Sequence, residues 1–161
     1  MSTLVQSPLP SRHAVRTLIE GLIGRDVDIK DAEPVPPKAT NVVAVYVTDR
    51  QAVSALAVIN LELAARLGGA LAMLPKGGVD EAITGRELFA ALKNNCYEVL
   101  NVLSAVFNVG NAPHVRLYEM YGPNGAIPSD VAALSAIVGN RMDVSLRIAG
   151  YGEGLLSLVC R

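Results

Sequence analysis

The chain has 161 residues and a formal net charge of −1, with 51% hydrophobic residues and no tryptophan. A chain of this length can bury enough surface to fold as one domain without disulfides or a structural metal ion. Nucleic acid is not an expected partner, because a near-neutral chain with two Phe and five Tyr supplies neither the basic surface nor the aromatic stacking platforms that such binding uses.

Cysteine usage and the N-terminal sequence predict a cytoplasmic protein. Cys96 and Cys160 lie far apart, each inside an apolar run, which favours buried thiols in a reducing compartment over a disulfide. Residues 1–10 contain no signal-peptide pattern and are expected to form a flexible tail. No apolar stretch approaches the roughly 20 residues that span a bilayer, so no membrane association is expected. Residues 1–161 are therefore predicted to form one cytoplasmic domain.

The first part of the chain predicts one helix and three strands. Apolar residues at helical spacing predict an amphipathic helix over 11–24. Alternating charged and apolar residues predict a half-exposed strand over 26–30, and the prolines that follow it predict a loop. Two apolar, β-branched runs over 42–47 and 53–59 are separated by turn residues. These two runs are typical of a central β-hairpin.

A short helix that ends at two glycines is predicted next. Asn60 can cap a helix over 61–67, because its side-chain carbonyl can accept a hydrogen bond from a backbone N–H of the first turn. Gly68 and Gly69 offer a left-handed exit or a break before the apolar stretch 70–74. We therefore expect the helix to end or break at this pair.

The longest predicted helix covers residues 84–108. The polar, glycine-containing segment 76–83 before it predicts a surface loop. Thr84 and Glu87 form a capping-box pattern, in which the hydroxyl and the carboxylate satisfy backbone amides at the start of a helix. The many apolar residues that follow require this helix to be packed on most of its sides.

The remaining elements complete an α+β fold. A strand is predicted over 115–120, a turn over 122–125, a short helix over 129–138 and a closing hairpin over 144–148 and 155–159. The chain has too few strand-helix-strand crossovers for a doubly wound parallel sheet. The predicted fold class is an α+β layer sandwich, in which an antiparallel sheet packs against long helices.

A narrow polar stripe runs along the predicted helix 84–108. On a helical wheel, five polar residues fall within about 40° of one line; they are Glu87, Asn94, Glu98, Asn101 and Asn108. An ordinary surface helix with a thin exposed face would also show such a stripe. The stripe therefore marks a candidate site but does not by itself predict a function.

Two residues of the stripe resemble a family motif. Glu98 and Asn101, in the sequence Glu-Val-Leu-Asn, match the Glu-x-x-Asn motif of the CheC/CheX/FliY chemotaxis phosphatases, which lies on the long helix of that fold. The predicted order of elements from Val42 onward also resembles this family. The resemblance implies a CheX-like layer sandwich.

The activity that the resemblance implies is hydrolysis of the aspartyl phosphate on a CheY-like response regulator. Asn101 would position the attacking water, because a carboxamide can accept from water and donate to a phosphoryl oxygen. Glu98 would anchor the receiver by pairing with its active-site lysine, and Asn94 and Asn108 would contact the partner. Mg²⁺ is expected from the receiver, since this sequence shows no oxygen-rich cluster that would hold a metal.

Other functions stay open at this stage. The family pattern has Asp or Ser at the position of Asn94, and this difference favours a non-catalytic CheX-like module that docks on a receiver or a switch protein. A third possibility is a small-ligand sensor that uses a gap beside the polar stripe. The resemblance also allows a homodimer, because relatives such as CheX pair through their sheets, whereas other members are monomers.

Overall fold

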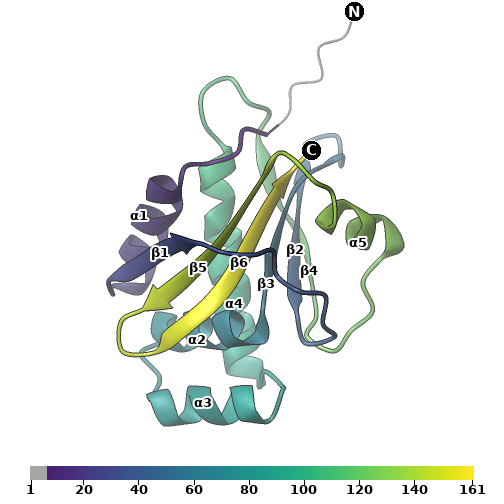
Figure 1. The fold of residues 1–161 in the computed structure, drawn as a ribbon. Helices are drawn as coiled ribbons and strands as arrows, with labels where there is room; N and C mark the ends of the chain where they lie inside the picture. The colour runs from purple at the N-terminus through teal and green to yellow at the C-terminus, as the bar shows by residue number, and fades with distance from the viewer. Residues whose placement is uncertain (1–6) are drawn as a thin grey trace, which may run out of the picture.

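The computed structural model describes residues 7–161, in which one six-stranded antiparallel sheet carries helices on both faces (Figure 1). The strand order is β1-β5-β6-β3-β2-β4. The strands are β1 (Val27–Asp31), β2 (Val42–Thr48), β3 (Val53–Ile59), β4 (Val115–Tyr121), β5 (Arg141–Ile148) and β6 (Gly152–Cys160). The helices are α1 (Arg12–Ile23), α2 (Leu61–Leu71), α3 (Lys76–Thr84), α4 (Ala90–Leu103) and α5 (Ser129–Ser135). This arrangement confirms the predicted α+β class.

The two predicted hairpins form the middle of the sheet. β2 pairs with β3 from Val42 opposite Ile59, and β5 pairs with β6 from Ile148 opposite Gly152. Nearly every residue of β2 and β3 is buried, because successive side chains point to opposite faces and both faces are covered. This double burial explains why both strands are continuous apolar runs without polar alternation.

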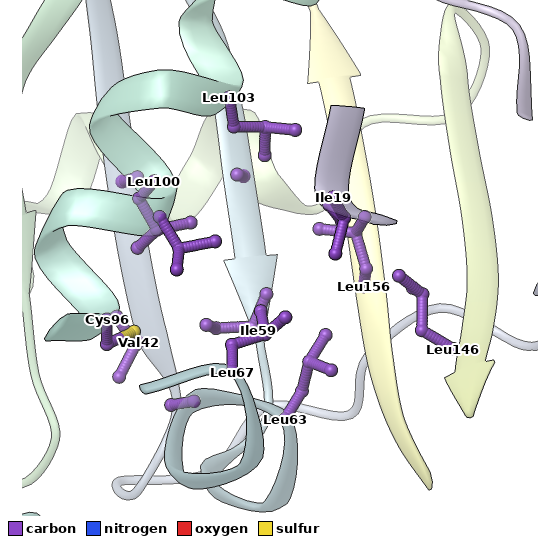
Figure 2. Close-up of a cluster of buried hydrophobic side chains, with 14 of the residues drawn as sticks. Ile19, Val42, Ile59, Leu63, Leu67, Cys96, Leu100, Leu103, Leu146 and Leu156 are labelled. Carbon is purple, nitrogen blue, oxygen red and sulfur yellow. The ribbon is translucent and has the colours of Figure 1, made fainter. Parts of the chain in front are cut away.

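One face of the sheet, here called the inner face, is covered by α1, α2 and α4. Its core combines helix residues with inward-facing strand residues, and Figure 2 draws 14 of them and labels ten. The labelled residues are Ile19, Val42, Ile59, Leu63, Leu67, Cys96, Leu100, Leu103, Leu146 and Leu156. The helices thus bury their apolar sides against one continuous core, which fixes α4 relative to the sheet.

The opposite face, here called the outer face, has a much smaller cover. Its apolar cluster contains Val43 and Val45 of β2, Leu56 and Val58 of β3, and Val131 of α5. In Figure 1, α4 passes behind the strands, whereas α5 lies at the right beside β2 and β4. The single short helix α5 and neighbouring loops therefore cover this face.

Capping interactions confirm the predicted starts of α1 and α2. The Ser11 side chain accepts a hydrogen bond from the Ala14 amide at 3.0 Å, and Gly24 ends α1 in the left-handed region with φ 68°. The Asn60 side-chain Oδ1 accepts from the backbone amides of Leu63 at 3.0 Å and Leu155 at 3.1 Å. Asn60 therefore caps α2 and also ties its start to β6.

The predicted end of α2 at Gly68 and Gly69 is wrong. The helix continues through both residues to Leu71, and Gly68 lies where α2 crosses α4. A Cβ atom on Gly68 would come within 2.6 Å of the Leu92 carbonyl oxygen of α4. Tertiary packing therefore overrides the low helix propensity of glycine, because the missing side chain lets the two helices approach closely.

The predicted helix over 84–108 is wrong at both ends, and the predicted loop over 76–83 is helical. Thr84 is the last residue of α3, which starts after Pro75 and buries Val79 and Ala82. Proline suits a helix start because its ring fixes φ near the helical value. The chain then turns, with Arg86 in the left-handed region at φ 56°. The Thr84–Glu87 pattern is therefore not a capping box.

The last third of the chain follows the prediction with shifted bounds. The strand predicted over 115–120 is β4, and the predicted closing hairpin is longer on both strands. The predicted helix 129–138 is the shorter α5, which ends at Ser135. The strands exceed the predicted ranges because ladder pairing continues past the apolar residues, from Arg141 opposite Val159 onward.

The predicted flexible tail over 1–10 is described only from residue 7 onward; residues 1–6 lie outside the described residues. Ser7 is buried, with its hydroxyl 2.6 Å from that of Ser54. The Cys160 thiol lies 3.9 Å from the Pro8 carbonyl oxygen. These contacts hold residues 7 and 8 against the end of the sheet. Among the described residues, no helix combines the length and apolarity that crossing a membrane requires.

Candidate functional site

The exposed side of α4 carries the two residues of the sequence motif. Asn94, Tyr97, Glu98 and Asn101 are all exposed, at the i, i+3, i+4 and i+7 spacing that places residues on one side of a helix. We call these four residues the α4 face. Glu98 and Asn101 lie one turn apart on it, as the helical wheel predicted.

The opposite side of α4 is buried in the inner core. Leu92, Cys96, Val99, Leu100 and Leu103 are at most 1% exposed, and Figure 2 shows Cys96, Leu100 and Leu103 directed into the cluster. The Asn95 side-chain amide also donates to the Gly68 carbonyl of α2 at 3.1 Å. Apolar packing and this helix-to-helix hydrogen bond hold α4 in place, so the α4 face has a rigid support.

Tyr46 fixes the backbone next to Asn101. Its buried hydroxyl donates to the Leu100 carbonyl at 2.6 Å. That carbonyl is free because the Ser104 amide bonds to the carbonyls of Asn101 and Val102 instead, and the chain tightens into a 3₁₀ turn (η1, Ser104–Phe107). Burial raises the pKa of Tyr46 well above its ordinary value, so its hydroxyl stays protonated and remains a donor.

Glu98 and Asn101 have their side-chain polar atoms available. Within residues 7–161, neither side chain takes part in a hydrogen bond or an ion pair of the structure. A free carboxylate can accept from a cationic group, and a free carboxamide can both donate and accept. The pair can therefore offer a negatively charged acceptor and an amide that both donates and accepts, one helical turn apart.

Two members of the predicted polar stripe lie outside α4. Glu87 precedes the helix, in the turn after α3. Asn108 follows η1, and its side chain is used by the backbone of Val115: Oδ1 accepts from the amide at 2.8 Å and Nδ2 donates to the carbonyl at 2.9 Å. Asn108 therefore secures the start of β4. Of the predicted partner-binding residues, Asn94 lies on the α4 face.

Tyr97 is the α4-face residue that the sequence reasoning left out. The residue is 40% exposed and lies on the same helix side as Asn94 and Asn101. Half-exposed aromatic side chains are frequent anchors in protein interfaces. The signal was available, because a tyrosine four residues before Asn101 must share its helix side, but the search for polar residues passed over it.

Within residues 7–161, the thiols are buried and the carboxylates are scattered. Burial raises the pKa of the Cys96 thiol to about 12 and that of Cys160 to about 11, so neither forms a thiolate near neutral pH. In the part of the chain that the structure describes, no three His, Cys, Asp or Glu side chains gather as a metal site. The α4 face is therefore the candidate site.

Comparisons with known proteins bear on the fold. The sequence matches no protein-family model, and no curated protein matches it. Solved structures do match: FliM of H. pylori in a complex with SpeE has a TM-score of 0.59 at 12% identity, over 92% of this chain and 80% of that chain. The FliM middle domain from Vibrio alginolyticus has a TM-score of 0.55 at 9% identity, over 92% and 87%.

A CheX structure matches over a similar length. CheX of Borrelia burgdorferi, in a complex with CheY, BeF3 and Mg²⁺, has a TM-score of 0.51 at 10% identity, over 92% of this chain and 93% of that chain. Identities this low carry information on the fold alone. The sequence-based expectation of a CheX-like fold is confirmed: this chain has the fold shared by CheX and the FliM middle domain.

Proposed function

We propose that this domain binds a CheY-like receiver through the α4 face and hydrolyses its aspartyl phosphate. The observation that carries the proposal is the pair Glu98 and Asn101, which are exposed one turn apart on a helix whose other side is fixed in the core. A pre-positioned amide is effective here because phosphoryl transfer depends mainly on positioning and charge neutralisation.

In the proposed reaction, water attacks phosphorus and the bond between phosphorus and the aspartyl oxygen breaks. The products are inorganic phosphate and the free aspartate of the receiver. The side-chain oxygen of Asn101 holds the water by accepting a hydrogen bond from it, and the side-chain N–H donates a hydrogen bond to a phosphoryl oxygen, a combination that a carboxylate cannot provide. Glu98 pairs with the receiver's lysine and sets the depth at which Asn101 enters. The receiver supplies Mg²⁺.

The neighbouring structures support a receiver as the partner. The Borrelia CheX structure is a complex with CheY, BeF3 and Mg²⁺, so a domain of this fold is able to hold a receiver. In this chain, Tyr97 adds an apolar anchor beside the two polar residues. A mixed apolar and polar face of this kind is typical of a specific protein interface.

A second candidate is a docking module that binds its partner without hydrolysis. One observation favours it: Asn94 replaces the Asp or Ser of the family pattern. A domain of the same fold, FliM of H. pylori, is also seen in a complex with a protein other than a receiver, SpeE. In this reading, the α4 face still binds the partner, but Asn101 contributes to affinity instead of rate.

The test is phosphate release from phosphorylated receiver domains in the presence of Mg²⁺. We expect Asn101→Ala to lower the rate constant about 100-fold, the usual effect of removing one group that stabilises a transition state. Glu98→Ala should mainly raise KM because it removes an anchor. Glu81→Ala, an exposed glutamate on α3, is the matched control and should behave as the wild type.

The same experiment separates the two candidates. A wild-type domain that forms a complex with a phosphorylated receiver but leaves its lifetime unchanged selects the docking module. Absence of both complex and phosphate release, across the receivers tested, contradicts both proposals. Thermal unfolding of each variant is the folding control, since exposed substitutions usually change the unfolding free energy by less than about 0.5 kcal/mol.

A further inference from the structure

Asn101 differs from the rest of the α4 face in how its backbone is held. In a regular α-helix, each carbonyl accepts a hydrogen bond from the amide four residues further along the chain. Here the two carbonyls that flank the Asn101 Cα atom, those of Leu100 and of Asn101 itself, each accept a hydrogen bond from a side-chain hydroxyl. Within residues 7–161, no side chain donates to the carbonyls of Tyr97 or Glu98. The additional bonds therefore occur only at the end of the α4 face that carries Asn101.

The first hydroxyl belongs to Tyr46 of β2. Its side chain is fully buried, and its hydroxyl donates to the Leu100 carbonyl at 2.6 Å. The Phe107 ring packs against the Tyr46 ring with 5.3 Å between the centroids. A buried ring that is packed in this way has few other positions to adopt, because protein interiors are close-packed. The peptide group that leads into Asn101 is therefore fixed relative to the sheet.

The second hydroxyl belongs to Ser104, at the end of α4. It donates to the Asn101 carbonyl at 2.8 Å, and the Ser104 amide bonds to the same carbonyl. In a continuing α-helix, the Ser104 amide would bond to the Leu100 carbonyl instead. Tyr46 satisfies that carbonyl, and the chain tightens into η1 at this point. The peptide groups on both sides of Asn101 are thus held by contacts that an ordinary helix lacks.

We propose that the Tyr46 and Ser104 hydroxyls are positioning groups for Asn101 in the hydrolysis proposed above, and this inference rests on that proposed function. The rotamers open to a side chain depend on its backbone, so a fixed backbone fixes the direction of the Asn101 carboxamide. Reactions that depend on positioning lose rate when a group shifts by about 1 Å. Glu98 lies one turn before the two bonds, and its anchoring should not depend on them. Loss of either hydroxyl should therefore lower kcat and leave KM unchanged.

The test compares Tyr46→Phe with Tyr151→Phe in phosphate release from phosphorylated receiver domains with Mg²⁺. Tyr151 is the matched control, because it is 4% exposed and its hydroxyl donates to the Leu74 carbonyl at 2.7 Å, in the turn between β5 and β6. Each variant thus removes one hydrogen bond from a buried tyrosine to a backbone carbonyl. We expect Tyr46→Phe to lower kcat about tenfold or more with KM changed by less than about twofold, and Tyr151→Phe to retain both wild-type values. Equal kcat in the two variants, or a raised KM with an unchanged kcat, would overturn the proposal.

A double-mutant cycle tests whether Tyr46 acts through Asn101. In the Asn101→Ala background, Tyr46→Phe should lower kcat by less than about twofold, because the group that it positions is already absent. The same loss of kcat in both backgrounds would contradict the proposal, since Tyr46 would then act on another group.

Ser104→Ala tests the second hydroxyl independently of the buried tyrosine. Ser104 is only half-buried, so this variant should fold even if Tyr46→Phe does not, and thermal unfolding of each variant sets an assay temperature at which it is folded. We expect kcat to fall about fivefold, the usual contribution of one hydrogen bond, with KM unchanged. A wild-type kcat would overturn the joint role of the two hydroxyls.

The outcomes separate this inference from the proposed function. If the wild-type domain releases no phosphate from any receiver, the proposed function fails and the positioning role fails with it. If the wild type is active and the Tyr46 and Ser104 variants match it, the positioning role alone fails.

Discussion

The two faces of the sheet are built from the same strands but are covered very differently. β2 and β3 send Tyr46 and Ile59 into the inner core and Val43 and Val58 towards the outer face. Three helices close the inner face, whereas the seven-residue α5 and nearby loops cover the outer one. On the closed face, the polar site can only lie on the outside of a covering helix. On the thinly covered face, the space left between elements forms a cavity of about 1000 Å³.

The largest expected effect tests how tightly each face is packed. Leu100 of α4 is 1% exposed, whereas Leu134 of α5 is half-buried. Leu100→Ala should lower the free energy of unfolding by about 2–5 kcal/mol, the range for a buried leucine in a closed core. Leu134→Ala should cost less than about 1.5 kcal/mol, since less apolar surface is lost. Urea unfolding measures both, and equal losses would refute the difference between the faces.

A smaller effect is expected where α2 and α4 cross on the inner face. Gly68→Ala should lower the free energy of unfolding by about 1–3 kcal/mol, as overpacking usually does, because the new Cβ would meet the Leu92 carbonyl. Gly21 of α1 is the matched control, with nothing within 4 Å of an added Cβ. Gly21→Ala should stabilise by up to about 1 kcal/mol through helix propensity. If both variants unfolded alike, close helix approach would not be the reason for Gly68.

The smallest effect concerns acid sensitivity at the outer face. Burial alone would raise the pKa of Asp143, but the hydrogen bonds from Arg141 and Ser157 and the charge of Arg141 outweigh it and hold the pKa below the ordinary 3.8. A lowered folded-state pKa contributes stability above the unfolded-state value, and this stability is lost as pH falls through the folded-state value. We therefore expect an additional loss of wild-type stability below about pH 4.

Urea unfolding between pH 2.5 and 5 checks this expectation. Asp143→Asn should lower stability at pH 5 and flatten the acid dependence, because the neutral amide no longer titrates. Asp31→Asn is the control. The Asp31 carboxylate forms an exposed ion pair with Arg12 at 3.0 Å, and exposed pairs contribute little to stability, so this variant should follow the wild type. If the free energy of unfolding of Asp143→Asn fell with decreasing pH in parallel with that of the wild type, Asp143 would not be the source of the acid dependence.

Local pattern was sufficient for the elements whose ends are determined by neighbouring residues. α1 begins at a serine cap and ends at a left-handed glycine, both of which act within one turn of the chain. The two hairpins follow from apolar runs divided by turn residues. The exposure of Glu98 and Asn101 was also predictable, since residues three apart share a helix side and the flanking residues are too apolar to face water.

The sequence by itself determined the α+β composition, the main strands and the exposed acid and amide pair, because these depend on periodicity and short-range hydrogen bonds. Tertiary structure decided the rest. Gly68 continues α2 because α4 lies against it, and Asn108 leaves the polar stripe because the backbone of Val115 uses its amide. The cavity on the outer face is lined by segments distant in sequence, and no local pattern encodes how such segments meet.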